Sequence, residues 1–238
     1  MATTLLIATG NPGKMREYAD LLKGLPYKLV CLKDVGITHE VNETGETFEE
    51  NAWLKASEYA SMSGLLTLAD DSGLEVHSLN GEPGVRSARY GGESCHNDED
   101  RVALLLKNMV DIPWVERGAR FQCVIAIADP SGTTSLPSCS CTYDQNSRPI
   151  LTGNAIPRSN TSTDSEPSRV TQAEGSVAGM IQYEAQGDDG FGYDPVFYLP
   201  EYGQTAAQLS PIVKNQISHR AKAVESVAEA LQNFTTYR

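Results

Sequence analysis

The chain begins with a short apolar run followed by a helical pattern. Residues 5–8 are apolar, and a dense group of turn-forming residues follows at 9–13. From Lys14 the apolar positions recur at helical spacing, and Gly24 is a typical helix end. This segment therefore predicts a strand, a tight loop and a helix.

A second helix and strand follow. Residues 47–63 predict a helix whose first turn holds a capping box of Thr47 and Glu50. The apolar residues 65–69 predict a buried strand, which we expect to end at the polar residues 70–73.

The remaining apolar segments add a helix at 98–109, a strand at 121–128 and a C-terminal helix beyond the cap residue Ser210. Strands alternate with helices early, and the middle of the chain is rich in strands. This order predicts a single α/β or α+β domain over residues 1–238, built on a mixed sheet.

One segment breaks the pattern. Residues 136–171 are rich in Ser, Thr, Pro and Asn and show no sustained period, and we expect regular structure to resume at Gly175. Such a segment buries little apolar surface. It is interpreted as a polar insert, either a disordered surface loop or a flap over the cleft or the dimer edge.

Charge limits the classes of partner. The chain has 238 residues and a net charge of −12, from 31 acidic against 19 basic residues, with no Lys/Arg-rich run. This balance disfavours binding to a nucleic acid polymer but allows a small anion held by a few cations and helix N-termini.

No apolar run is long enough to span a bilayer, and the N-terminus lacks a signal-peptide pattern, so we expect a cytoplasmic protein without membrane contact. Five irregularly spaced cysteines argue against a disulfide framework.

The loop at residues 9–14 is the first candidate site. Glycines let a backbone approach phosphate, a helix N-terminus offers free N–H groups, and Lys14 adds a positive charge. It is not a Walker A loop, because Met15 follows the lysine where Ser or Thr would ligate magnesium. The alternative is an ordinary turn with a solvated lysine.

Two acidic segments are candidate metal ligands. Asp70 and Asp71 follow a buried strand, and Mg²⁺ needs only one or two carboxylates besides phosphate oxygens. Adjacent strand residues face opposite sides, so we expect one aspartate in the site unless the strand has ended. Glu43 precedes a helix on which Asn51 and Lys55 share a face; a solvated face is the favoured interpretation of those two.

Two C-terminal segments are candidates for base recognition. Phe191 and Tyr193, spaced by glycine and followed by Asp194, predict two exposed aromatic rings that stack on a base and a carboxylate that accepts from its N–H edge. Lys214 and residues 218–220 supply donors for carbonyl or phosphate oxygens. The alternatives are a glycine-rich turn with core aromatics and a surface helix cap.

The order of these motifs resembles the inosine/xanthosine triphosphate pyrophosphatase family. The resemblance covers the chain outside the insert and rests on the stretches 8–14, 43–52, 68–75, 83–90, 190–197 and 218–220. It implies an elongated α/β fold of two lobes about a cleft, a homodimer, and Mg²⁺-dependent hydrolysis of ITP, dITP and XTP to the monophosphate and pyrophosphate.

The resemblance also implies residue roles. Asp71 would be the general base and a metal ligand, with Glu43 as a second metal ligand. The substrate-binding residues would be Thr9, Gly10, Asn11, Pro12, Gly13, Lys14, Ser72, Phe191, Gly192, Tyr193, Asp194, Lys214, His219 and Arg220.

One departure matters for the metal. Many relatives carry an acid where this chain has Asn42, so Glu43 would have to serve, or Asn42 would act as a neutral donor. Two other functions stay open: a related pyrophosphatase that prefers other nucleotides, such as a pyrimidine, and a nucleotide sensor without catalysis.

Overall fold

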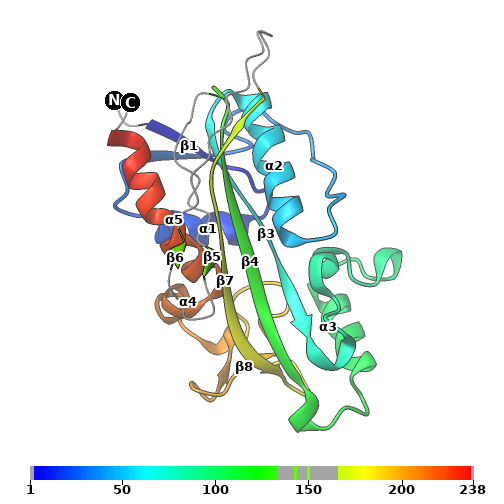
Figure 1. Cartoon of the computed structure of the whole chain (residues 1–238). Coiled ribbons are helices and arrows are strands. Elements are labelled where there is room, and N and C mark those ends of the chain that lie inside the picture. The colour runs from blue at the N-terminus through cyan, green and yellow to red at the C-terminus, as the bar shows by residue number, and fades with distance from the viewer. Residues whose placement is uncertain (1–2, 133–141, 144–148, 151–165, 237–238) are drawn as a thin grey trace.

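The described residues form a mixed sheet of seven strands in the order β2-β1-β3-β4-β7-β8-β9 (Figure 1). The computed structural model describes residues 3–132, 142–143, 149–150 and 166–236. Strand β1 runs parallel to β2 and β3, whereas the later pairs are antiparallel. The predicted mixed sheet is thereby confirmed. Its strands are β1 (Thr3–Ile7), β2 (Tyr27–Cys31), β3 (Leu66–Val76), β4 (Gly118–Asp129), β7 (Ser168–Ile181), β8 (Phe197–Leu199) and β9 (Gln204–Thr205).

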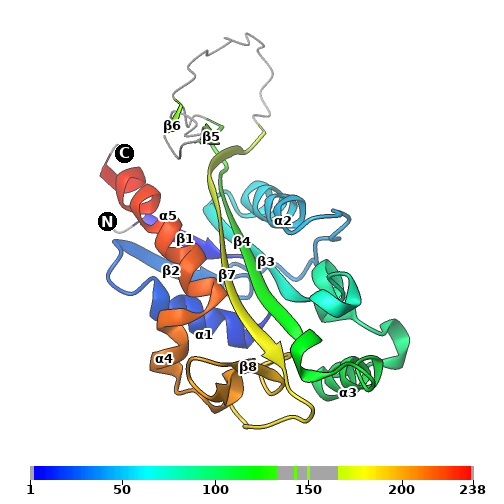
Figure 2. The same ribbon diagram turned by 60° about the horizontal axis from the view of Figure 1, so that its bottom comes forward.

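Helices cover both faces of the sheet (Figures 1 and 2). Strand β1 shows why, because Leu5 packs with α1 and α5 on one face while its neighbour Leu6 packs with α2 on the other. The far ends of β3 and β4 pack with α3 and β8 in a third apolar cluster. The helices are α1 (Pro12–Leu21), α2 (Phe48–Ser63), α3 (Asp98–Asn108), α4 (Pro211–Ile217) and α5 (His219–Thr236).

The helix starts follow from local side-chain caps. In α2 the Glu50 N–H donates to Thr47 Oγ1 at 3.2 Å and the Thr47 N–H donates to Glu50 Oε2 at 3.3 Å, which confirms the capping box. Asn97 caps α3, and Ser210 caps α4. These contacts between residues close in the sequence determine where α2, α3 and α4 begin.

Several predicted boundaries are wrong, including the start of β4, which lies at Gly118 rather than at residue 121. Helix α1 begins at Pro12 rather than at Lys14, because Asn11 caps it and proline suits the first helical position. Strand β3 does not end at residue 69 but continues through the polar segment to Val76, paired with β4 throughout. Strand β7 begins at Ser168 rather than at Gly175, since it pairs with the end of β4.

The expected insert is therefore shorter at its C-terminal end, because residues 168–171 belong to β7. Within the rest, β5 (Thr142–Tyr143) pairs with β6 (Pro149–Ile150). Residues 136–141, 144–148 and 151–165 lie outside the described residues, so the loop and flap interpretations stay predictions. In the described part of the chain, no helix combines the length and apolar character that a membrane crossing requires.

Candidate active site

A pocket lies along the edge of β3 where β1 has ended. Strand β1 pairs with β3 only over Leu66–Leu68, and its last contact is the Ala8 N–H donating to the Leu68 carbonyl at 2.8 Å. Beyond that point the β3 edge faces the pocket. Most of the predicted site residues line it: Asn11, Lys14, Glu43, Asp71, Ser72, Phe191, Gly192, Tyr193, Asp194, Lys214, His219 and Arg220. Thr9, Gly10, Pro12 and Gly13 are not among its lining residues.

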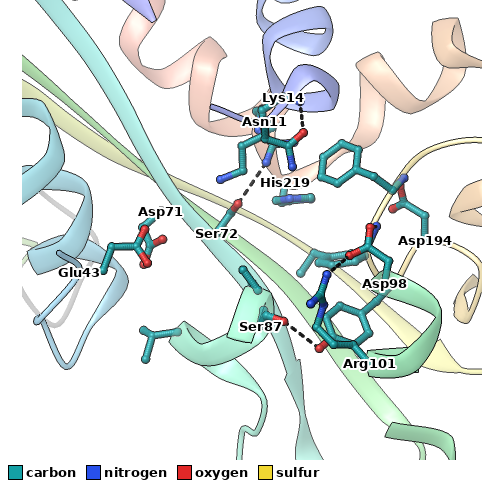
Figure 3. A pocket seen from close by; sticks show the side chains of 18 of the residues that line it. Asn11, Lys14, Glu43, Asp71, Ser72, Ser87, Asp98, Arg101, Asp194 and His219 are labelled. Atoms are coloured by element: carbon teal, nitrogen blue, oxygen red, sulfur yellow. Dashed lines mark hydrogen bonds and ion pairs between the residues drawn. The ribbon is translucent and has the colours of Figure 1, made fainter. Parts of the chain in front are cut away.

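Two carboxylates meet at one end of the pocket (Figure 3). The Lys55 ammonium bridges them, with Nζ 2.6 Å from Glu43 Oε1 and 3.1 Å from Asp71 Oδ1. Burial and the nearby charge of Glu43 raise the pKa of Asp71, and Lys55 opposes this only in part. Asp71 is therefore a stronger base than an exposed aspartate.

The interpretation of Asn51 and Lys55 as a solvated helix face is wrong. Asn51 is fully buried, and its amide donates to Asp71 Oδ2 at 3.2 Å. Only 12% of the Lys55 side chain is exposed. The face of α2 that these two residues share packs behind the carboxylates, so α2 positions Asp71.

Asp70 points to the other face of β3. Its Oδ2 lies 2.9 Å from Lys14 Nζ and 3.4 Å from Arg220 Nη2. Burial alone would raise the pKa of Asp70, but the two cations outweigh it and hold that pKa well below its ordinary range. Because β3 is still extended at this point, the two aspartates are separated by the sheet and only Asp71 lines the pocket, as the alternation rule predicts.

The first backbone N–H groups of α1 already bond to the residue that caps the helix, Asn11. Asn11 Oδ1 accepts from the N–H groups of Gly13 and Lys14 at 2.7 and 3.2 Å, so these two amides already have an acceptor. Asn11 itself and the Lys14 ammonium line the pocket. Phosphate binding by this loop stays a prediction, and the side chains of Asn11 and Lys14 carry it better than the capped amides do.

The glycine-rich loop after β7 is held together by Asp194. Its Oδ2 accepts from the Phe191 N–H at 2.9 Å and from Lys214 Nζ at 2.7 Å. Tyr193 is 4% exposed, and its hydroxyl donates to the Ser87 carbonyl at 2.9 Å. The prediction of two exposed aromatics is thus wrong for Tyr193, which is a core residue that also borders the pocket.

The last cationic group is buried as well, so the surface-cap alternative is wrong. Arg220 donates through Nη2 to Ser72 Oγ at 3.1 Å and through Nη1 to Glu17. Its Nε has no acceptor within the described residues. His219 stacks on Phe121 with ring centroids 4.8 Å apart. Burial and the neighbouring cations hold the pKa of His219 well below its ordinary value, so the imidazole is neutral.

Comparison with known proteins settles the family. A model of the Ham1 family matches residues 5–141 and 159–230, most of the chain. The chain belongs to the Ham1 family. It is 42% identical to the dITP/XTP pyrophosphatase of Desulforamulus reducens, over 97% of this chain and 96% of the relative, and 40% identical to that of Geobacter sulfurreducens, over 96% of each. The solved Ham1 protein of Coxiella burnetii superimposes with a TM-score of 0.73 at 34% identity, covering 97% of this chain and 99% of the other.

The Ham1 match skips residues 142–158, which lie inside the segment interpreted as an insert. The sequence interpretation also missed pocket residues. Ser87, Asp98, Arg101 and Phe121 line the pocket but were not named as site residues; Ser87 lies in the stretch 83–90 that supports the resemblance, whereas the other three lie in no such stretch. A usable signal exists for Asp98 and Arg101, since residues three apart at the start of a predicted helix share a face.

Proposed function

We propose that this chain hydrolyses the non-standard purine nucleoside triphosphates ITP, dITP and XTP to the monophosphate and pyrophosphate. The observation that carries the proposal is one pocket with two unlike ends. Glu43 and Asp71 lie at one end, and Asp98, Arg101 and Asp194 lie at the other, with His219 between them. The aromatic rings of Phe121, Phe191 and Tyr193 also line the pocket. Cations and a carboxylate pair suit a triphosphate, and aromatic rings suit a base. The names of the relatives, dITP/XTP pyrophosphatase, support the same reaction.

The carboxylate end fits a magnesium ion. Among the described residues no group of three or more His, Cys, Asp or Glu side chains converges, but Mg²⁺ needs only one or two carboxylates besides phosphate oxygens and water. Glu43 and Asp71 share one ammonium, so their oxygens are close enough to face a common cation. Asn42 is exposed, which favours Glu43 as the second ligand. Bound there, the ion would offset charge on the phosphates.

Asp71 is the general base of the proposed reaction. Its carboxylate takes a proton from water as that water attacks the α-phosphorus. The bond from the α-phosphorus to the bridging oxygen breaks, and pyrophosphate leaves. Asn51 and Lys55 keep the Asp71 carboxylate in place through contacts of 3.2 and 3.1 Å.

Lys14 and Arg220 hold the phosphates and the nucleoside next to Asp71. Both side chains line the pocket, and both form an ion pair with the Asp70 carboxylate. The Arg220 Nε is a buried donor without an acceptor among the described residues, which costs about 1–3 kcal/mol. With neutral His219 and Lys214 alongside, the donor set favours a 6-oxo purine over adenine, whose 6-amino group would leave donors unpaired.

Turnover of ITP, XTP, GTP, ATP and dUTP with Mg²⁺ tests the proposal. We expect ITP and XTP to be hydrolysed far faster than ATP. A preference for dUTP would overturn the purine assignment, and tight binding of ITP without turnover would favour a sensor. We further propose, from the family resemblance, that the enzyme is a cytoplasmic homodimer.

A further inference from the structure

A charged pair, Asp98 and Arg101, lines the pocket at the end away from Glu43 and Asp71. Asp98 and Arg101 lie at the start of α3, and both line the pocket opposite Glu43 and Asp71 (Figure 3). Arg101 Nη2 lies 2.5 Å from Asp98 Oδ1, and the Arg101 side chain is only 17% exposed. The Asp98 side chain is 45% exposed, so Arg101 is the better buried member of the pair.

The pair presents donors rather than acceptors to the pocket. Asp98 Oδ1 accepts from Arg101, and Asp98 Oδ2 accepts from the Gly192 N–H at 2.7 Å. Both carboxylate oxygens therefore already have a protein donor. A guanidinium has five N–H groups, and Asp98 uses one of those of Arg101. The remaining N–H groups are what a ligand at this end would meet.

The position of Asp98 and Arg101 suits contact with the C2 edge of a bound purine. If the proposed triphosphate lies at Asp71 and Lys14, the base would extend toward the end of the pocket where Arg101 lies. The candidate purines differ at C2: xanthine carries a carbonyl oxygen, guanine an amino group and hypoxanthine only hydrogen. A cationic N–H donor stabilises the carbonyl, and it leaves the amino group of guanine facing another donor.

We propose that Arg101, held in place by Asp98, is a specificity-determining residue that selects a 2-oxo purine and disfavours a 2-amino purine. The inference rests on the proposed triphosphate pyrophosphatase function. It explains discrimination against GTP, which the 6-position cannot provide because guanine and hypoxanthine share the 6-oxo group.

The test is Arg101→Met, with kcat/KM measured by pyrophosphate release from XTP, ITP and GTP. We expect kcat/KM for XTP to fall about 10- to 100-fold, while ITP, which lacks a C2 substituent, stays within about two-fold. The kcat/KM for GTP should rise, because the 2-amino group no longer faces a cationic donor, and an unchanged value would contradict a role of Arg101 against 2-amino purines. Asp98→Asn should lower the ratio of kcat/KM for XTP to that for ITP by a smaller factor than Arg101→Met does, because Arg101 is still present but has lost its ion pair. Arg120→Met is the matched control, since Arg120 also pairs with a carboxylate, Glu75, but lies outside the pocket.

The ratio of XTP to ITP turnover within one preparation does not depend on how much of a variant folds. An unchanged ratio in Arg101→Met, or an equal loss for both substrates, would overturn the assignment of Arg101. Failure of the proposed function is distinguishable, because the wild-type protein would then not release pyrophosphate from ITP.

Discussion

Asp70 and Asp71 are neighbours in β3, yet their carboxylates face opposite sides of the sheet and their pKa values shift in opposite directions. Asp70 contacts Lys14 and Arg220, which hold its pKa down, whereas Asp71 is buried near Glu43, and its pKa is raised. The two adjacent acids therefore lie in different surroundings, one on each face of the sheet. Asp70 pairs with two cations of the pocket, and Asp71 is the proposed general base.

Asp71→Asn should abolish pyrophosphate release from ITP without unfolding the protein. The substitution keeps the shape of the side chain and removes the group that accepts the proton, which is worth about 10²- to 10⁴-fold in rate. Turnover and the denaturant midpoint are the two measurements. Near-normal turnover by this variant would rule out Asp71 as the base.

Asp70→Asn should instead lower the free energy of unfolding, by about 3 kcal/mol, because it leaves two buried cations less well paired. The folded pKa of Asp70 is depressed, so its contribution is present above the ordinary carboxyl pKa and is lost as the pH falls toward the folded value. Urea unfolding at several pH values measures this. The gap between wild type and variant should be full at neutral pH and shrink in acid; a gap that grows in acid would contradict the assignment.

The charges around Asp71 should tune its titration in the metal-free protein. Removing a like charge with Glu43→Gln should lower the Asp71 pKa, and removing the ammonium with Lys55→Met should raise it. Carbon-13 NMR of the aspartate carboxyl groups follows both shifts directly. If the two variants moved the pKa in the same direction, the proposed balance of charges would be wrong.

Gly13→Ala should weaken substrate binding through Phe191. A Cβ atom at Gly13 would lie 2.5 Å from Cδ1 of the Phe191 ring, so the ring must move. We expect the KM for ITP to rise about three- to ten-fold through lost stacking. Gly10→Ala is the matched control in the same loop, since Gly10 is not among the residues that line the pocket and nothing lies within 4 Å of a Cβ there. Equal effects of both substitutions would exclude a specific role for the ring.

Local chemistry predicted part of this fold. The capping box of Thr47 and Glu50 depends on residues three apart, and so does the cap of α3 by Asn97. Such contacts are legible in the sequence because both partners lie within one helical turn. The alternation of side chains along β3 likewise predicted that one aspartate alone faces the pocket.

The parts of the fold and of the site that the sequence did not predict depend on contacts between residues far apart in the chain. The spacing of Asn51 and Lys55 shows that they share a helix face, but not that this face is buried against Asp71. The ion pair between Glu17 and Arg220 joins α1 to α5, which are 203 residues apart at this contact. Strand β3 continues through its two acids because each finds a cation on its own side of the sheet, and those partners come from other elements.

The central claim is hydrolysis between the α- and β-phosphates, and the products test it most directly. The protein is incubated with ITP and Mg²⁺ in water enriched in oxygen-18, and the products are identified by mass spectrometry. The account predicts inosine monophosphate that carries the label, together with unlabelled pyrophosphate. Inosine diphosphate with inorganic phosphate, or label in the pyrophosphate, would contradict it.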